Sequence, residues 1–293
     1  MYQLCTIGHI TLDKIQTPAS VNYLPGGTGL YMSMALRNLN IRYLLVTAVA
    51  PGEQYIIDKL RTDGVEVISL PSTHTVYFEN IYGENPDHRD QNVLNIADPF
   101  TVASLPDVSA GIFHLGPLLY QDFSEALFPV LASKGIISLD VQGLLRHVKN
   151  KKVSYTDWNS KEELLKHVTI LKANEFELET LTGTSNVKEG AKYLAGLGVK
   201  EVVITLGSKG SLVYSDDLFV NIPAFPPTAT IDTTGCGDTY MAGYLFKRIN
   251  GASIEDSGIY GAAMATLKIQ SFGPFTGSSA DINEMVSSMY AFK

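Results

Sequence analysis

Residues 231–243 read Ile231-Asp-Thr-Thr-Gly-Cys-Gly-Asp-Thr-Tyr-Met-Ala-Gly243, and this stretch guides the interpretation of the whole chain. Apolar residues then recur at the spacing of one helical face, at Ala242, Leu245, Phe246 and Ile249. This spacing predicts a helix that begins just after the glycines. Glycine lets backbone N–H groups converge at such a helix start, and the helix dipole favours an anion there. The stretch therefore predicts an anion-binding loop.

Asp238 is an acidic residue in the first turn of this predicted helix. An acid repels phosphate, so its place beside an anion site needs an explanation. In one interpretation, Asp238 is simply a favourable charge on the helix dipole, and Asp232 and Thr233 form a turn. In the other, the N–H groups hold a transferring phosphoryl group while Asp238 accepts the proton of an attacking hydroxyl group.

The run Asp232-Thr-Thr-Gly-Cys-Gly-Asp238 resembles the D-T-x-G-A-G-D signature of the ribokinase-like (PfkB) small-molecule kinases. Cys236 replaces the usual alanine, a change between small residues that keeps the backbone N–H. The resemblance implies that Asp238 is the catalytic base and that Gly235, Cys236 and Gly237 form the anion hole. Because similar signals occur along nearly the whole chain, we expect a single ribokinase-like kinase domain over residues 1–293.

Composition limits the classes of partner. The 293 residues are 45% hydrophobic and 18% charged, which is typical of a globular protein with a large core. The net charge of −8 argues against binding to nucleic acid or to an anionic membrane surface. Residues 1–8 lack the features of a signal peptide, and Cys5 and Cys236 show no metal-binding spacing. We therefore expect a cytoplasmic protein in a reducing compartment.

The order of predicted elements indicates an α/β fold. Apolar strand-like runs alternate with helical segments, which predicts a central, mostly parallel sheet with helices on both faces. Ligands bind such sheets at the carboxyl ends of the strands. Residues of about 11–24 and 74–97 instead alternate polar and apolar side chains and predict a small separate β-sheet. The resemblance makes this small sheet a lid over a sugar site, and it leaves a homodimer through the lid open.

Several residues are candidates for substrate binding. Asp13 is either an edge-strand charge or, as the resemblance implies, a partner of sugar hydroxyl groups. Gly26 and Gly27 permit a sharp turn and a close approach of a ligand. Tyr31 stands where the family has asparagine, so it removes a polar group and adds an aromatic wall. Arg146 follows a predicted strand end and suits either a phosphate or acidic substrate group, or a surface ion pair.

Asn174 and Glu177 have two interpretations. Asn174 is a good helix N-cap, and Glu177 three residues later completes the pattern of a capping box. The resemblance implies instead that these side chains organise the water ligands of Mg²⁺ beside a triphosphate. Because Mg²⁺ keeps several waters, one or two protein groups are enough for such a site.

A second glycine turn points to the phosphate donor. Thr205 and Gly207, followed by Gly210, are either a hairpin corner or, by the resemblance, contacts to the nucleotide together with Thr234. Residues 262–264 in a predicted Ala-rich helix would then hold adenine by shape and apolar contact. Gly273 leaves open a monovalent-cation loop nearby.

These signals favour an ATP-dependent phosphotransferase that phosphorylates a hydroxyl group of a sugar or polyol with Mg²⁺, similar to fructokinase or ribokinase. The sequence contains neither a G-x-x-x-x-G-K-[ST] loop nor the H-R-D and D-F-G motifs of protein kinases. Two alternatives remain. A nucleoside kinase would use Tyr31 and the aromatic residues of the lid to stack on a base, and a catalytically silent homologue would only bind a ligand.

Overall fold

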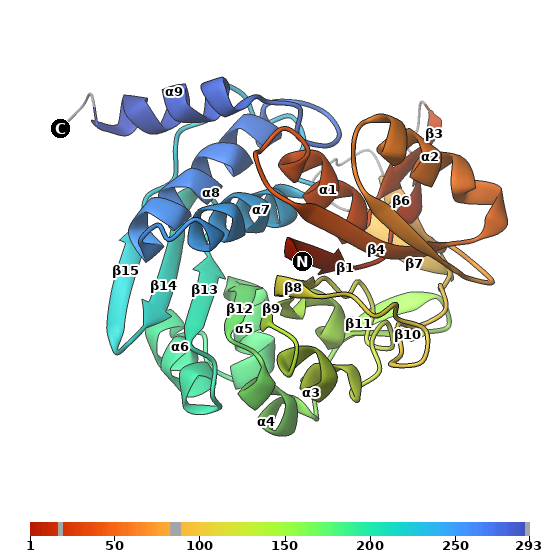
Figure 1. Cartoon of the computed structure of the whole chain (residues 1–293), viewed down its shortest axis with the longest axis horizontal. Coiled ribbons are helices and arrows are strands. Elements are labelled where there is room, and N and C mark those ends of the chain that lie inside the picture. Colours follow the sequence, from red (N-terminus) through yellow and green to blue (C-terminus); the bar gives the residue numbers. More distant parts are fainter. Residues whose placement is uncertain (17–19, 83–88, 291–293) are drawn as a thin grey trace.

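The structure is a computed structural model that describes residues 1–16, 20–82 and 89–290. A nine-stranded sheet forms its centre, with the strand order β15-β14-β13-β12-β9-β8-β1-β4-β5 (Figure 1). All neighbouring strands are parallel except for β13-β14 and β14-β15. The strands are β1 (Tyr2–Ile7), β4 (Tyr43–Val49), β5 (Val67–Pro71), β8 (Ala110–Leu115), β9 (Ile136–Asp140), β12 (Ile170–Asn174), β13 (Glu201–Thr205), β14 (Ser211–Ser215) and β15 (Leu218–Ile222).

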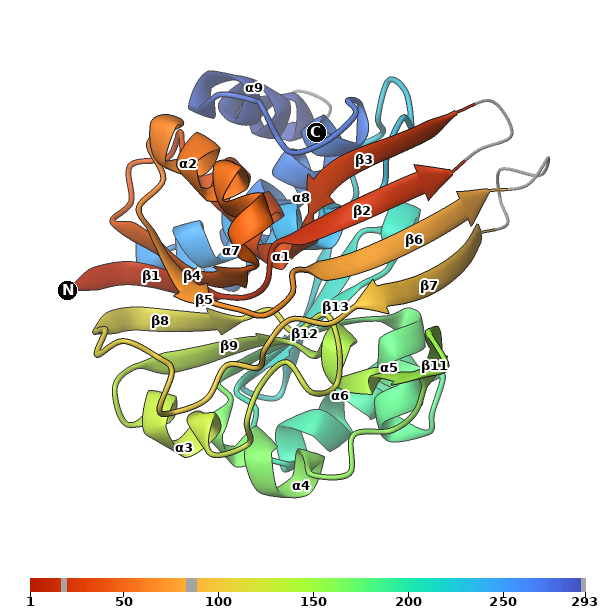
Figure 2. The ribbon, with the colours of Figure 1, turned by 90° about the vertical axis from the view of Figure 1, so that its right-hand side faces the viewer.

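Helices cover both faces of this sheet, which confirms the predicted α/β class (Figures 1 and 2). One face carries α1 (Gly27–Leu36), α2 (Gln54–Thr62), α7 (Cys236–Ile249), α8 (Ile254–Ile269) and α9 (Ser279–Tyr290). The opposite face carries α3 (Leu127–Ala132), α4 (Lys161–Leu164), α5 (Glu175–Thr182) and α6 (Val187–Gly196). None of the described helices is long and apolar enough to cross a lipid bilayer.

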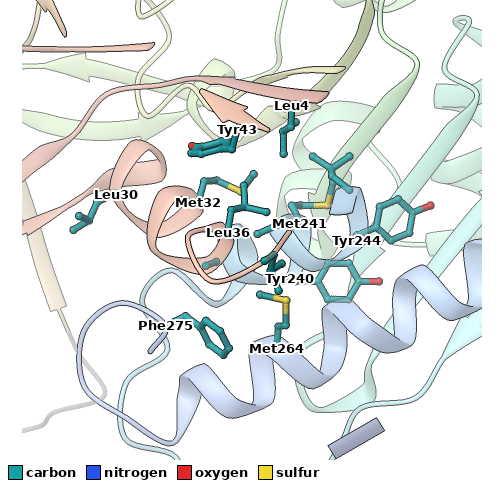
Figure 3. Packing of buried hydrophobic residues seen from close by; sticks show 14 of the residues in the cluster. Leu4, Leu30, Met32, Leu36, Tyr43, Tyr240, Met241, Tyr244, Met264 and Phe275 are labelled. Atoms are coloured by element: carbon teal, nitrogen blue, oxygen red, sulfur yellow. The ribbon is translucent and has the colours of Figure 1, made fainter. Parts of the chain in front are cut away.

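Each face of the sheet has its own hydrophobic core. Neighbouring residues of one strand point to opposite faces, so Leu44 packs in one core and Leu45 in the other. This two-sided burial explains why the central strands read as continuous apolar runs in the sequence. In the core under α1, α7 and α8, Met241 of α7 packs beside Met32 of α1, and Tyr244 of α7 lies next to Tyr240 (Figure 3).

The strand order reverses beside β1. The chain first adds β4 and β5 on one side of β1 and then places β8, β9, β12 and β13 on the other. At such a reversal the loops that follow adjacent strands diverge and leave a crevice at the carboxyl ends. The ends of β9, β12 and β13 supply Asp140, Asn174 and Thr205 to this edge of the sheet.

A second sheet lies over this edge, with the order β10-β11-β7-β6-β2-β3 (Figure 2). Its strands are β2 (Thr11–Gln16), β3 (Val21–Gly26), β6 (Val76–Tyr82), β7 (Arg89–Asn95), β10 (Arg146–Lys149) and β11 (Lys152–Tyr155). A small core that includes Val76, Phe78 and Leu119 lies under it.

The sequence analysis missed the hairpin of β10 and β11. Its strands are short and rich in charge, with little apolar alternation beyond Val148 and Val153. The turn between them places Asn150 and Lys151 at φ values of 50° and 65°. Two consecutive positive φ angles are typical of a type I′ hairpin turn. Because the second turn residue is not glycine, the usual sequence signal for this turn is weak.

Candidate active site

A cavity of about 990 Å³ lies between the two sheets. It is lined by residues from the small sheet, from the carboxyl ends of the central strands and from the glycine loop, Asp232–Asp238. Of the residues predicted from the sequence, the lining includes Asp13, Gly27, Tyr31, Arg146, Asn174, Thr205, Thr234, Gly235, Gly237 and Asp238. Residues that are separated by more than two hundred positions in the sequence thus meet in one cavity.

The glycine loop ends at the N-terminus of α7, as predicted. Gly235 is the N-cap residue with φ of 75°, a left-handed conformation that favours glycine. The first N–H groups of a helix have no partner within the helix, so they are available to an anion. Gly235 and Gly237 line the cavity, whereas the Cys236 N–H donates to the Thr233 carbonyl at 3.3 Å. Of the three N–H groups that the sequence predicts for an anion hole, only those of Gly235 and Gly237 are therefore available.

The Asp238 carboxyl lies in the first turn of α7 and lines the cavity. Burial, together with the nearby Asp140 carboxylate, raises the pKa of Asp238 to about 7. Lys172 and a hydrogen bond from Thr28 act in the opposite direction. A carboxyl with a pKa near neutrality is suited to accept a proton during a reaction at that pH.

Lys172 was missed by the sequence analysis. Its ammonium group is buried at the cavity floor, 2.9 Å from Asp140 Oδ2 and 3.6 Å from Glu177 Oε2. Burial alone would lower the pKa of Lys172, but the two carboxylates raise it, so the residue stays charged. A Cβ atom built on Gly237 would lie 3.3 Å from Lys172 Nζ, which places this charge beside the anion hole. The sequence does contain a signal for this site, because a lysine within an apolar strand is a buried charge that needs partners.

The opposite wall of the cavity comes from the turn between β3 and α1. Gly27 has φ of 83°, and a Cβ on it would lie 2.5 Å from the His9 carbonyl oxygen. Only glycine fits this position without a shift of the backbone. A Cβ on Gly26 would lie 3.0 Å from Asp13 Oδ2, so the turn packs directly against the Asp13 carboxylate. Gly27 lines the cavity and Gly26 does not, so the close approach of this turn to a ligand stays a prediction.

The packing of Tyr31 against the glycine loop was not predicted from the sequence. Its side chain is buried, and a Cβ on Gly235 would lie 2.1 Å from Tyr31 Cδ1. The ring therefore packs flat against the N-cap of α7 and limits that position to glycine. Tyr31 also borders the cavity.

Three further polar side chains reach the cavity. Arg146 at the start of β10 lines it, and its charge lowers the pKa of the nearby Asp238 and Glu177 carboxyls relative to burial alone. Asn80 and Gln91 face each other across β6 and β7, and Gln91 Nε2 donates to Asn80 Oδ1 at 2.9 Å. Each of the two amides keeps further hydrogen-bonding capacity for a ligand. The sequence analysis did not select this pair, because alternating strands contain many polar residues.

Asn174 and Glu177 form the capping box. Asn174 Oδ1 accepts from the Glu177 N–H, and Glu177 Oε2 accepts from the Asn174 N–H, both at 2.8 Å. Asn174 lines the cavity, while Glu177 is buried behind it next to Lys172. Among the residues that the structure describes, no cluster of three His, Cys, Asp or Glu side chains could form a metal site of its own.

The second glycine turn closes the hairpin between β13 and β14. Gly210 has φ of 91°, and a Cβ on it would lie 2.0 Å from the Ile222 carbonyl oxygen. Thr205 lines the cavity, but Gly207 and Gly210 lie outside the lining. The contact of Gly210 gives this glycine a structural role that is independent of a nucleotide, whereas Gly207 has open space around it and a φ of 58°.

The expectation that residues 262–264 would hold adenine is wrong. Ala262, Ala263 and Met264 are buried in the core between α7 and α8. Figure 3 shows Met264 directed into this core near Tyr240. The absence of a side chain at Gly243 lets α7 and α8 pack closely, since a Cβ on it would lie 2.7 Å from Met264 Sδ.

Comparisons with known proteins agree with this geometry. Residues 2–281 match the pfkB family of carbohydrate kinases. A cytidine kinase from Thermococcus kodakarensis is 28% identical over 288 residues, which cover 94% of this chain and 99% of that protein.

Two solved structures share the fold over their whole length. A pyrophosphate-dependent kinase of the ribokinase family, complexed with a pyrophosphate analogue and myo-inositol, superimposes with a TM-score of 0.86 at 30% identity and covers 96% of this chain and 100% of that chain. Another structure shows a pyrophosphate-dependent myo-inositol-1 kinase converted into a myo-inositol-3 kinase by replacing an asparagine and a serine with leucine. It has a TM-score of 0.85 at 28% identity and covers 98% of this chain and 99% of that chain.

We expect Gly235→Ala to destabilise the protein more than Gly251→Ala. Both glycines have φ near 76°, at 75° and 77°, so alanine costs about 1–2 kcal/mol of backbone strain at either position. Only Gly235 faces the Tyr31 ring, whereas the space around Gly251 is open. Urea unfolding should therefore show an additional loss of about 1–3 kcal/mol for Gly235→Ala. Equal losses for the two variants would contradict the proposed contact.

Asp238→Asn should stabilise the protein in a pH-dependent way. The folded-state pKa of about 7 exceeds the ordinary value of 3.8, so between these pH values the folded state binds more protons than the unfolded state. The free energy of unfolding of the wild type therefore falls as pH rises through this range. Asparagine removes this loss, and we expect a gain of about 1–3 kcal/mol at pH 8 and little gain at pH 4.

Thermal unfolding of both proteins across this pH range tests the expectation. Asp58→Asn is the control, because Asp58 is an exposed residue of α2 far from the cavity. A pH-independent difference between Asp238→Asn and the wild type would show that the Asp238 carboxyl is not held in this environment.

Proposed function

Because this chain belongs to the pfkB family of carbohydrate kinases, we propose that it transfers a phosphoryl group from ATP to a hydroxyl group of a sugar or cyclic polyol. The observation that carries this proposal is the position of Asp238 beside the N-terminus of α7, in a cavity that Asp13 enters from the other side. An acceptor held by Asp13 and the Gly26-Gly27 turn would present its hydroxyl group to Asp238. The small sheet would act as the lid that excludes water.

In the proposed reaction, the acceptor oxygen attacks the terminal phosphorus of the donor and its proton passes to Asp238. The bond between that phosphorus and the bridging oxygen breaks, and the donor leaves with one phosphate fewer. The N–H groups of Gly235 and Gly237 and the Lys172 ammonium group stabilise the charge on the transferring phosphoryl group. Arg146, Thr205 and Thr234 line the same cavity and would contact the phosphates.

The residues near Asn174 fit a hydrated magnesium ion. Mg²⁺ in kinases is bound mainly by waters and substrate phosphates, with one or two protein groups. Asn174 lines the cavity and would hold such an ion through water, with Glu177 behind it fixing the orientation of the amide. When bound, the ion neutralises charge on the donor phosphates.

The amide pair of the small sheet, Asn80 and Gln91, indicates the class of acceptor. In the myo-inositol kinase described above, the two substituted residues lie eleven positions apart and decide which hydroxyl group is phosphorylated. Asn80 and Gln91 are also eleven positions apart, are hydrogen-bonded to each other and line the cavity. This match supports a cyclic polyol as the acceptor. The cytidine kinase relative favours a nucleoside as the second candidate.

Pyrophosphate is the alternative donor. The family resemblance supports ATP, but the two solved structures above at 28–30% identity belong to pyrophosphate-dependent kinases. The burial of residues 262–264 also removes the apolar adenine contact that the sequence analysis expected. Phosphate-transfer assays with each donor against inositols, other sugars and nucleosides separate these possibilities.

We expect Asp238→Asn to lower kcat by about 10²–10⁴-fold, because it removes the proton acceptor. The wild-type kcat/KM should rise with pH to a plateau above about 7, since Asp238 must be ionised to act as base. This rising limb should be absent from the residual activity of the variant. A variant that keeps wild-type kcat with the preferred acceptor would exclude Asp238 as the base.

Replacing Asn80 or Gln91 with leucine should raise KM for the acceptor by about 5–100-fold or change the hydroxyl group that is phosphorylated, because a buried amide then lacks its partner. KM for the donor should change little. Asn92→Leu is the matched control, since Asn92 also lies on β7 but its amide donates to Glu79 and does not line the cavity. NMR of the product identifies the phosphorylated position, and equal effects of Asn80→Leu and Asn92→Leu would contradict the assignment.

A further inference from the structure

A second buried lysine lies next to the glycine loop. Lys268 belongs to the last turn of α8, and its side chain has no exposed surface. Its ammonium group donates to the Asp232 carbonyl oxygen at 2.8 Å and lies 2.9 Å from Asp232 Oδ2. Lys268 does not line the cavity, so it contacts neither substrate directly. Burying an ammonium group is costly unless it is paired, so a specific interaction must offset this cost.

Both carboxylate oxygens and the main-chain carbonyl oxygen of Asp232 accept hydrogen bonds. Oδ1 accepts from the Thr234 N–H at 2.9 Å, and Oδ2 accepts from the Gly273 N–H at 3.1 Å in addition to Lys268. Burial alone would raise the pKa of Asp232, but the hydrogen bonds from Lys268 and Thr234 lower it. Asp232 and Lys268 are therefore an ion pair that connects the glycine loop to the last turn of α8, and the Gly273 N–H connects the loop to the segment after α8.

This ion pair supports the anion hole from two sides. The N–H groups of Ile231 and Asp232 donate to the Ile269 carbonyl at 2.8 and 3.2 Å, so the start of the loop is docked on the end of α8. Lys268 Nζ also lies 5.9 Å from the centre of the Tyr31 ring, and that ring packs against Gly235. A cation at the C-terminal end of a helix and over an aromatic face is favourable in both contacts.

We propose that Lys268 is a positioning residue that supplies, as a permanent part of the chain, the charge that a bound monovalent cation would supply beside the glycine loop. A cation would bind to oxygen atoms such as the Asp232 carboxylate and main-chain carbonyl, and Lys268 Nζ already contacts both. The residues near Gly273 therefore do not fit the monovalent-cation loop that the sequence left open. The wild-type protein needs no potassium ion to hold its anion hole in place.

The kinetic test rests on the proposed function. Wild-type kcat should stay within about twofold when K⁺ is replaced by Na⁺ or choline at constant ionic strength, because the charge is built in. Lys268→Ala should lower kcat by about 10²-fold or more, since the anion hole loses its support. Adding K⁺, ammonium or methylammonium should then raise the kcat of Lys268→Ala by at least about tenfold. The increase should saturate with cation concentration, and KM for the acceptor should change little.

A second test does not need a reaction. Saturable binding of a cation to the folded state raises the melting temperature. K⁺ or methylammonium should therefore raise the melting temperature of Lys268→Ala by at least about 3 °C beyond their effect on the wild type. Lys268→Met should show no such rise, because its side chain fills the space. Lys247→Ala is the control, since Lys247 of α7 lies over the Tyr260 ring of α8 and does not contact Asp232.

Each outcome decides the proposal. A wild-type melting temperature or kcat that depends saturably on K⁺ would overturn it, and this measurement needs no variant. A folded Lys268→Ala that keeps wild-type kcat without added cations, or that no cation restores, would also overturn it. If no acceptor is phosphorylated, the proposed function fails, while the melting temperatures still test Lys268 separately.

Discussion

The ion pair between Lys172 and Asp140, with Nζ and Oδ2 2.9 Å apart, is the interaction on which the cavity floor depends. Both residues come from adjacent parallel strands, and Glu177 on the following helix adds a second carboxylate 3.6 Å from the same ammonium group. A buried lysine of this kind is stable only while its partners remain, and the partners are stable only while it remains. Asp238 is another acid near this group, and its burial, together with the nearby Asp140 carboxylate, raises its pKa to about 7 although Lys172 acts in the opposite direction.

The class of fold and the glycine loop could be predicted because they depend on local patterns. Apolar runs of strand length, helical spacing after residue 241 and a glycine before a helix start are all properties of short stretches. The β10-β11 hairpin was missed since its turn lacks glycine and its strands lack alternation. Lys172 and Lys268 were missed for another reason. In sequence, a lysine near a strand or helix end reads as a surface charge, and only the tertiary structure shows that it is buried.

Tyr31 illustrates how one substitution in a motif can be misread. The sequence analysis treated it as the loss of a polar substrate contact and the gain of an aromatic wall. In the structure, its ring fills the space beside Gly235 and lies over the Lys268 ammonium group. A tyrosine, a glycine with positive φ and a buried lysine therefore depend on each other, although they lie on three different helices or their ends. Such a dependence arises from packing and has no signature in any single stretch.

The charge of the whole protein sets the final constraint on the site. A chain with a net charge of −8 must attract a donor with several negative charges to a cavity that already contains Asp13, Asp140 and Asp238. Lys172 is largely neutralised by its two carboxylates, so Arg146 and the helix N-terminus supply most of the local attraction. In the proposed reaction, protonation of Asp238 near neutral pH would reduce the repulsion while the donor binds, and ionisation would be needed only when the hydroxyl group attacks. The raised pKa of Asp238 is thus compatible with both steps, which a carboxylate with an ordinary pKa would not be.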